Sequence, residues 1–243
     1  MRQASASAAR GMLCFGLLSL IGPALAGSIS VNPIRVTLTA AKAAGALVVR
    51  NSGADPSVVQ IEVMSWSQQD GRDVLVPTRE LLATPPIFTV PAGGSQTVRV
   101  GLRQGVDPRR EVSYRVIMQE VPPPPKPEFR GLQVALRLSV PVFVPPAVVS
   151  AAPLQWQATR NSQGDLQLSV SNPANIHVQI IRVKLSVDGK DLAPRTQLES
   201  AYVLPDQRRE WTLRFDPAPA VGTVLHLAAQ TDAGDVQSDL VVK

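Results

Sequence analysis

The chain has 243 residues, of which 44% are hydrophobic and 18% are charged, and its 24 basic side chains outnumber its 19 acidic ones. That length allows one large domain or two of roughly 100 residues each, and the composition excludes a disordered or collagen-like chain. The net charge of +5 is small and no basic run is longer than two residues, which argues against a nucleic-acid-binding protein because such proteins carry a concentrated basic face.

Residues 1–26 have the pattern of a secretory signal peptide. Arg2 and Arg10 precede an apolar stretch at 12–21, and the small residues of Ala24-Leu25-Ala26 are those that a signal peptidase accepts. The apolar stretch has about ten residues, whereas a membrane-spanning helix needs about twenty. We therefore expect cleavage after this site, export, and a mature chain with no stable membrane insertion. A retained N-terminal anchor is the alternative.

The remainder of the chain has the pattern of an all-β protein. Short runs of Val, Ile, Leu and Thr alternate with polar residues and are interrupted by turn sequences such as Asn51-Ser52-Gly53 and Asp70-Gly71. The strands expected before residue 145 are Ser30–Leu38, Ala46–Asn51, Ser57–Gln68, Val74–Val76, Ile87–Val90, Ser95–Leu102, Val112–Val121 and Leu132–Val144. Seven or eight strands in about 120 residues is typical of an immunoglobulin-like sandwich.

A second set of expected strands follows residues 145–153, whose prolines make a short, stiff connection. Asp188-Gly189 is the expected hairpin turn of this set. Its strands are Leu154–Thr159, Asp165–Ser171, His177–Val187, Leu192–Ala193, Ala201–Leu204, Glu210–Phe215, Thr223–Ala229 and Val236–Val242. We therefore predict an all-β chain of two immunoglobulin-like β-sandwich domains, residues 27–147 and 148–243, joined by a short Pro-rich link.

The last expected strand of the first domain, Leu132–Val144, is unusual in its length and in its apolar face. Thirteen residues span roughly 40 Å at about 3.3 Å per residue, and a typical strand has about five or six. Side chains two apart share a face and form an apolar ridge here, which begins with Leu132, Val134, Leu136 and Leu138. Two interpretations remain open: a half-buried strand after the proline-rich segment 122–127, or an exposed ridge on a sheet edge, which proteins tolerate mainly where they use it.

Four blocks of sequence stand out along the chain. They are Ser30-Val31-Asn32-Pro33-Ile34-Arg35, Ala83-Thr84-Pro85-Pro86-Ile87-Phe88, Tyr114-Arg115-Val116 with Glu120-Val121-Pro122-Pro123, and Leu132-Gln133-Val134-Ala135-Leu136. In this order, within two expected sandwiches, they form a specific signature. The chain resembles the periplasmic chaperones of the chaperone-usher pathway, which assemble pili on Gram-negative bacteria, and the resemblance covers nearly all of the expected mature chain.

The resemblance implies a function and a set of site residues. In this family, pilin subunits lack their final strand, and the chaperone lends the last strand of its first domain to complete them. The resemblance therefore implies a periplasmic protein with pilus subunits and an outer-membrane usher as partners and no cofactor. The implied donor side chains are Leu132, Val134, Leu136 and Leu138. The implied anchor for the subunit's C-terminal carboxylate is Arg35, in the cleft between the domains.

One departure from the family pattern concerns that anchor. Better-known members pair the arginine with a lysine near the end of the donor strand, and the matching residue here is Pro141. Residues 65–71 and 139–143 look like the archaic branch of the family, which accords with an altered anchor. We expect Arg115, on the strand that should pair with the donor strand, as the first substitute and Arg137 as the second. The proline is expected at a sheet edge or a bulge because it cannot donate a ladder hydrogen bond.

Little in the sequence indicates an enzyme or a metal site. The only cysteine, Cys14, lies in the expected signal peptide, which excludes disulfides and thiolate sites from the mature chain. His177 and His226 lie in different expected strands with no carboxylate cluster beside them, and Gly93-Gly94 lacks the lysine and helix of a phosphate loop. We predict no enzymatic activity, no metal and no cofactor. The alternative function is a secreted two-domain immunoglobulin-like structural or adhesive protein, which would bury the apolar ridge.

Overall fold

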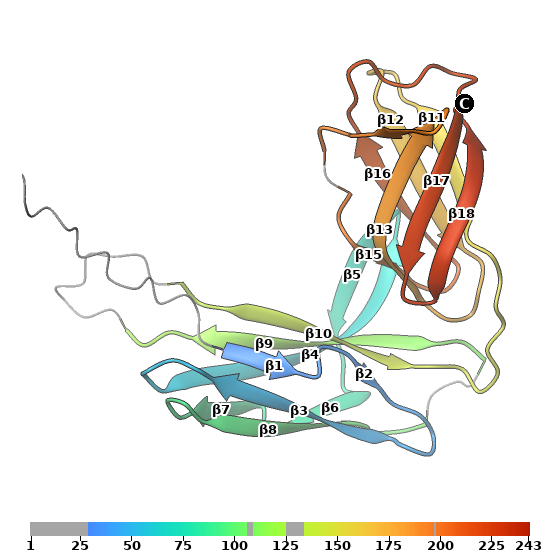
Figure 1. Ribbon diagram of the computed structural model, residues 1–243. Coiled ribbons are helices and arrows are strands. Elements are labelled where there is room, and N and C mark those ends of the chain that lie inside the picture. Colours follow the sequence, from blue (N-terminus) through green and yellow to red (C-terminus); the bar gives the residue numbers. More distant parts are fainter. Residues whose placement is uncertain (1–28, 106–108, 125–133, 197) are drawn as a thin grey trace, which may run out of the picture.

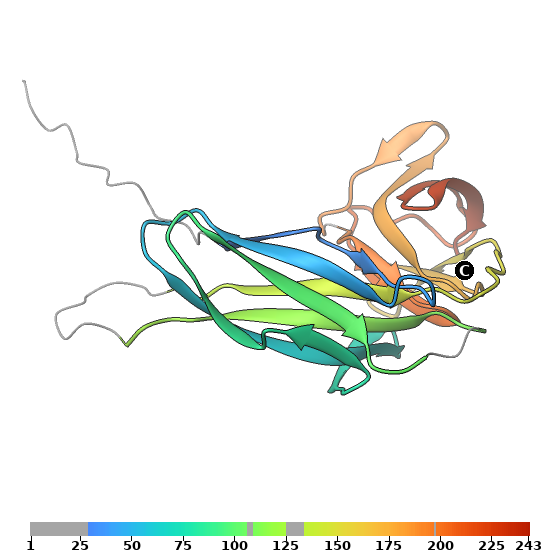
Figure 2. The ribbon, with the colours of Figure 1, turned by 90° about the horizontal axis from the view of Figure 1, so that it is seen from below.

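The structure is a computed structural model that describes residues 29–105, 109–124, 134–196 and 198–243. These residues form two β-sandwiches (Figure 1). The N-terminal sandwich is elongated along its strands, and the C-terminal sandwich stands at one of its ends, so that the two make an L (Figures 1 and 2). The described part of the chain contains no helix, and hence no helix long and apolar enough to cross a membrane. The predicted all-β class is confirmed.

The N-terminal domain packs a four-stranded sheet, in the order β1-β3-β8-β6, against a six-stranded sheet, in the order β2-β10-β9-β4-β5 with β7 also paired to β4. Its strands are β1 (Ile29–Asn32), β2 (Val36–Thr37), β3 (Ala44–Asn51), β4 (Ser57–Gln69), β5 (Arg72–Pro77), β6 (Leu81–Thr84), β7 (Ile87–Val90), β8 (Ser95–Leu102), β9 (Val112–Val121) and β10 (Arg137–Val144). Alternate residues of both sheets point inward and form one apolar core, with Leu47, Val98, Val116 and Val142 fully buried.

The C-terminal domain has a second, separate core between a three-stranded sheet, β11-β12-β16, and a five-stranded sheet, β14-β13-β17-β18 with β15 paired to β13. Its strands are β11 (Gln155–Arg160), β12 (Leu166–Asn172), β13 (Val178–Val187), β14 (Lys190–Leu192), β15 (Ala201–Val203), β16 (Gln207–Leu213), β17 (Val224–Thr231) and β18 (Gly234–Val241). Two apolar cores, each closed by its own pair of sheets, make two sandwiches rather than one extended barrel.

Two hairpin turns have the chemistry expected from the sequence. Asp70-Gly71 joins β4 to β5 and Asp188-Gly189 joins β13 to β14, and φ is +48° at each aspartate and +74° at each glycine. Positive φ at both central residues matches the right-handed twist of a hairpin, and these residue types tolerate it. The β4–β5 hairpin carries its turn out of the N-terminal sandwich to the C-terminal domain (Figure 1).

Several predicted strands agree with the structure at both ends, among them Ile87–Val90, Ser95–Leu102 and Val112–Val121. The prediction of one strand over Ser30–Leu38 is wrong, because this stretch forms β1 in one sheet and β2 in the other. Pro33 has no N–H to continue the ladder with β3, so the chain leaves the first sheet there and crosses to the second. Strand β6 was not predicted, since its sequence, Leu-Leu-Ala-Thr, has no apolar alternation.

The prediction of a strand over Leu132–Val144 is also too long for what is described. Regular pairing begins at Arg137, and Leu132 lies outside the described residues. Just before the strand, the backbone N–H of Glu120 donates to the carbonyl of Leu136 at 2.8 Å, and the N–H of Leu136 donates to the Glu120 side chain at 3.2 Å. Strand β9 ends one residue after Glu120, so the described residues before Leu136 have no strand of that sheet left to pair with.

Candidate functional site

Strand β10 has an open edge along its first half. The carbonyl of Leu136 accepts a hydrogen bond from the N–H of Glu120 at 2.8 Å, so the backbone N–H and C=O groups of the even-numbered residues point toward β9. The carbonyl of Phe143 accepts a hydrogen bond from the N–H of Leu38, just after β2, at 2.9 Å, so the backbone groups of the odd-numbered residues point to the opposite side of β10. Strand β2 reaches only the last residues of β10. The N–H and C=O groups of Arg137 and Ser139 therefore point to an edge that no strand of the described chain covers.

Pro141 lies on this same open side of β10. Because its nitrogen points away from β9, the missing N–H removes no hydrogen bond from the β9–β10 ladder. The proline is thus at a sheet edge, one of the two positions expected for it. The register places Arg115 of β9 directly opposite Pro141. A cation therefore lies one strand away from the position where the family resemblance implies a lysine.

The apolar ridge changes from exposed to buried along the strand. Val134 is 62% exposed, Leu136 and Leu138 are half-buried against the N-terminal core, and Val140 is only 2% exposed. Leu136, Leu138 and Val140 point toward the core face of the sheet, whereas Val134 lies ahead of the strand and outside that core. Each interpretation of the sequence therefore describes one part of the ridge: its end is core, and its start is open.

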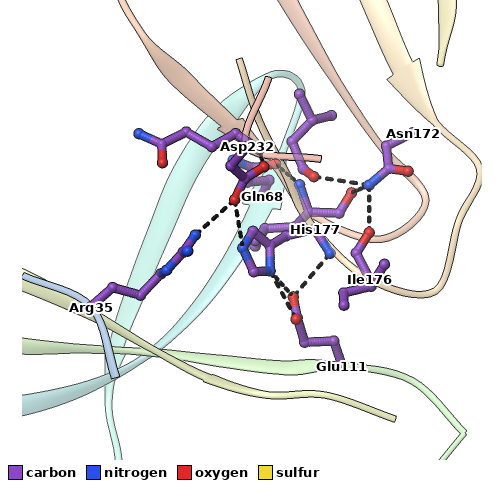
Figure 3. A network of polar contacts seen from close by, with 10 residues as sticks. Arg35, Gln68, Glu111, Asn172, Ile176, His177 and Asp232 are labelled. Carbon is purple, nitrogen blue, oxygen red and sulfur yellow. Dashed lines mark hydrogen bonds and ion pairs between the residues drawn. The ribbon is translucent and has the colours of Figure 1, made fainter. Parts of the chain in front are cut away.

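Arg35 lies in the crossover between β1 and β2, where the two domains meet (Figure 3). Its Nη1 is 2.7 Å from Oδ2 of Asp232, which belongs to the turn between β17 and β18. The other oxygen of Asp232 accepts a hydrogen bond from the backbone N–H of Gln179 at 2.8 Å. The Arg35 side chain remains 42% exposed, so part of its guanidinium is accessible from solvent.

His177 connects the two domains beside Arg35 (Figure 3). Its Nδ1 lies 2.8 Å from both carboxylate oxygens of Glu111, whose side chain is 1% exposed, and its Nε2 lies 3.7 Å from Asp232. Its ring stacks on Phe143, with the centroids 3.6 Å apart. No carboxylate cluster beside His177 was expected from the sequence, but the fold brings two carboxylates to it: Glu111, just before β9, and Asp232, in the turn between β17 and β18. The contacts satisfy a buried carboxylate at the domain junction.

Arg115 is held against aromatic rings rather than in open solvent. Its guanidinium carbon lies 3.6 Å from the ring centroid of Trp66 and 5.4 Å from that of Tyr202, which are cation–π distances. Burial lowers the pKa of Arg115 from its usual value, and the negative charge of Asp73 opposes that shift. A guanidinium stays charged under such shifts, so Arg115 is a partly buried cation at the junction.

The aromatic rings form a small apolar cluster between the domains. Trp66 of β4, Phe143 of β10 and Leu204 are buried in it, and Tyr202 packs against it. The Gln68 side chain accepts a hydrogen bond from the backbone N–H of Leu204 at 3.0 Å and donates one to the carbonyl of Tyr202 at 2.9 Å. The cluster and these hydrogen bonds fix the C-terminal domain against the β4–β5 hairpin.

The β4–β5 hairpin is also bound by Arg209 of β16. Its guanidinium donates to the carbonyl of Gly71 and, at 2.9 Å, to the carboxylate of Asp73. A further ion pair across the junction joins Arg110 to Asp206. Several polar contacts thus span the junction in addition to the apolar cluster, which favours one arrangement of the domains.

Arg35 and Arg115 both lie near Tyr202. Burial and the negative charge of Asp232 raise the pKa of Tyr202, while the positive charges of Arg35 and Arg115 lower it. Arg137 does not join them. It is exposed and lies opposite Gln119. Arg137 is four residues from Pro141 along β10, a separation of roughly 13 Å between the two residues in a strand.

Tyr202 and Asp232 belong to this site but were not predicted. Neither lies in a recognisable motif, and both come from the second domain. The described residues contain no cluster of three or more His, Cys, Asp or Glu side chains suited to a metal ion. The chemistry of the site is therefore that of two cations, a phenol and an open strand edge.

Comparison with known proteins identifies the family. Residues 28–150 match the family described as Pili and flagellar-assembly chaperone, PapD N-terminal domain, and residues 150–239 match Pili assembly chaperone PapD, C-terminal domain. The chain belongs to this family of pilus-assembly chaperones. It is a family of chaperones and not of enzymes, and both of its immunoglobulin-like domains are present in the predicted order.

Individual relatives agree with this family. The uncharacterized fimbrial chaperone YhcA of Escherichia coli K12 is 26% identical over 158 residues, which cover 65% of this chain and 66% of YhcA, just under two thirds of that relative. A chain of the CsuC–CsuE complex of a chaperone and a tip adhesion subunit, from Acinetobacter baumannii, has a TM-score of 0.67 at 20% identity, covering 89% of this chain and 99% of its own. A chain of the Salmonella enterica complex of the SafA pilin with the SafB chaperone has a TM-score of 0.61 at 24% identity, and the match covers 89% of this chain and 97% of the Salmonella chain. The two structures share the fold of this protein.

Proposed function

We propose that this protein is a periplasmic chaperone that binds pilus subunits by donor-strand complementation and delivers them to an outer-membrane usher. The observation that carries the proposal is the open edge of β10, with an exposed apolar ridge at its start. An open, apolar strand edge is an aggregation hazard, and proteins keep one mainly where a partner covers it. A subunit that lacks a strand is such a partner.

The open edge of β10 has the two features that strand addition uses. The N–H and C=O groups of Arg137 and Ser139 are available for main-chain hydrogen bonds to an added strand. Val134, Leu136 and Leu138 present alternate apolar side chains that their own core covers only in part. In strand addition, main-chain hydrogen bonds give affinity and alternate side chains fill pockets in the partner. Leu132 would extend this row and belongs to the same proposal.

The anchor for the subunit's C-terminal carboxylate is proposed to be Arg35 together with Arg115. Both guanidinium groups lie at the domain junction, close to the end of the donor strand. Asp232 engages one nitrogen of Arg35, and a guanidinium has further N–H donors that can bind a second carboxylate. Arg115 lies opposite Pro141 and can supply the positive charge that a lysine would otherwise bring. Charge-assisted bonds of this kind are among the stronger hydrogen bonds.

Three further parts of the proposal rest on the sequence and the family. Export depends on the signal peptide at residues 1–26, which lies outside the described residues. Membership of the archaic branch is supported by Pro141 in place of the lysine and by the likeness of fold to the CsuC–CsuE complex. The protein is proposed to act by binding alone, without catalysis or a cofactor.

The test is co-export of the tagged protein with a candidate pilus subunit from the same organism. We expect the subunit to survive periplasmic proteolysis and to copurify with the protein, and to be lost with the double variant Val134→Ser, Leu136→Ser. The control is Val241→Ser in β18, which replaces a valine of similar exposure, 53%, in the other domain. A subunit that survives equally with the double variant would contradict the proposal. An adhesive module is less well supported, because it would bury Val134.

A further inference from the structure

Tyr202 crosses the domain junction from the C-terminal side. It lies in β15, and its carbonyl accepts hydrogen bonds from Gln68 at 2.9 Å and from Arg209 at 3.2 Å. Its ring meets Trp66 edge-on with the centroids 5.4 Å apart, and it lies 5.5 Å from Phe143. The backbone and the ring of Tyr202 are thus held in place, which fixes the position of its hydroxyl group.

The Tyr202 ring lies beside the two cations of the proposed anchor and near the carboxylate of Asp232. The positive charges of Arg35 and Arg115 both act on its phenol, and the guanidinium carbon of Arg115 is 5.4 Å from the ring centroid. Burial and the negative charge of Asp232 together raise the pKa of Tyr202 against the two positive charges, so the phenol keeps its proton at neutral pH. A protonated phenol can donate its hydrogen to an acceptor. Within the described part of the chain, no acceptor takes that hydrogen.

We propose that Tyr202 is a ligand of the subunit's C-terminal carboxylate, donating its hydroxyl hydrogen to one oxygen while Arg35 and Arg115 neutralise the charge. This inference rests on the proposed function, in which that carboxylate binds at Arg35. It adds a residue from the second domain to the site. Two guanidinium groups and a hydroxyl hydrogen together favour the binding of a negatively charged hydrogen-bond acceptor, such as a carboxylate. The bound carboxylate then contacts both domains.

The test is a binding measurement with Tyr202→Phe, which removes only the hydroxyl and keeps the ring. The probes are a pilus subunit with its natural C-terminus and the same subunit extended by two glycines, which displaces the carboxylate. We expect Tyr202→Phe to weaken binding of the natural subunit about tenfold, the typical effect of losing a hydrogen bond to a charged group. Binding of the extended subunit should change less than about twofold. Tyr114→Phe, at the only other tyrosine, is the matched control in the first domain.

The outcomes separate this inference from the proposed function. If Arg35→Ala and the glycine extension both leave binding unchanged, the carboxylate anchor itself is wrong. If Arg35→Ala weakens binding but Tyr202→Phe does not, only the role of Tyr202 is overturned. If Tyr202→Phe weakens binding of both subunits equally, the hydroxyl acts through packing at the junction and the inference is again overturned. Melting curves of the variants show whether each one is folded.

Discussion

Replacing Val134 with serine should separate client binding from stability. Val134 is 62% exposed at the start of the ridge, whereas Val140, on the same face of the same strand, is 2% exposed. If a subunit covers the start of the ridge, the apolar surface of Val134 leaves water only in the complex. Val134→Ser should therefore weaken the complex while leaving the free protein almost as stable as before.

The size of the effect follows from the exposed fraction. Full burial of a valine side chain is worth roughly 1.5 to 3 kcal/mol, so covering the 62% that remains exposed contributes roughly 1 to 2 kcal/mol. That corresponds to a loss of about 5- to 25-fold in affinity, and a serine hydroxyl left in a dry pocket adds to it. The free energy of unfolding should change by about 0.5 kcal/mol or less, as is usual for an exposed position. Val140→Ser should cost about 2 to 4 kcal/mol, because it opens a cavity and buries a hydroxyl.

The assay pairs a competition measurement of subunit affinity with thermal melting of the free variants. Val241→Ser, in which a valine with 53% exposure is replaced in the C-terminal domain, is the control for the chemistry of the change. It should bind subunits as the parent does. The reasoning is refuted if Val134→Ser binds as well as Val241→Ser, or if it melts as early as Val140→Ser.

Three other predictions concern the anchor, the junction and export. Arg35→Ala should weaken subunit capture about ten- to a hundredfold, since a hydrogen bond to a charged group is worth roughly 1.5 to 3 kcal/mol. The variant should lose little stability, because the ion pair of Arg35 with Asp232 is partly exposed. Equal capture by the variant and the parent in a pull-down would leave Arg115 as the residue to test. His177→Ala should lower the free energy of unfolding by about 3 kcal/mol in urea, because the buried carboxylate of Glu111 loses its side-chain partner and keeps only the backbone N–H of residue 177. A loss below about 1 kcal/mol would contradict that role. The intact mass of the exported protein should correspond to a chain that begins at Gly27, and a form that retains residues 12–26 would contradict cleavage.

The features that were predictable from the sequence are those with a local pattern. The alternation in Ser95–Leu102 and Val112–Val121 gives both ends of two core strands, and Asp70-Gly71 and Asp188-Gly189 give two hairpin turns with positive φ. The open position of Pro141 follows from its missing N–H. These features depend on one or two neighbouring residues, so they can be recognised before the fold is known.

The features that were not predictable depend on contacts between distant segments. Ser30–Leu38 alternates like a single strand, and only the partners of its two halves, in different sheets, show that it is divided. Arg35 meets Asp232 across 197 residues, and His177 meets Glu111 across 66. No periodicity or spacing records such pairs. The place of Tyr202 in the site is likewise set by the packing of one domain on the other.

Amide hydrogen exchange along β10, with and without a bound pilus subunit, tests the central claim most directly. The N–H groups of Arg137 and Ser139 face the open edge, whereas those of Leu138 and Val140 face β9 in the free protein. Donor-strand complementation predicts that Arg137 and Ser139 exchange fast alone and become strongly protected in the complex, while Leu138 and Val140 are protected in both states. A tight complex in which Arg137 and Ser139 continue to exchange as in the free protein would contradict the account.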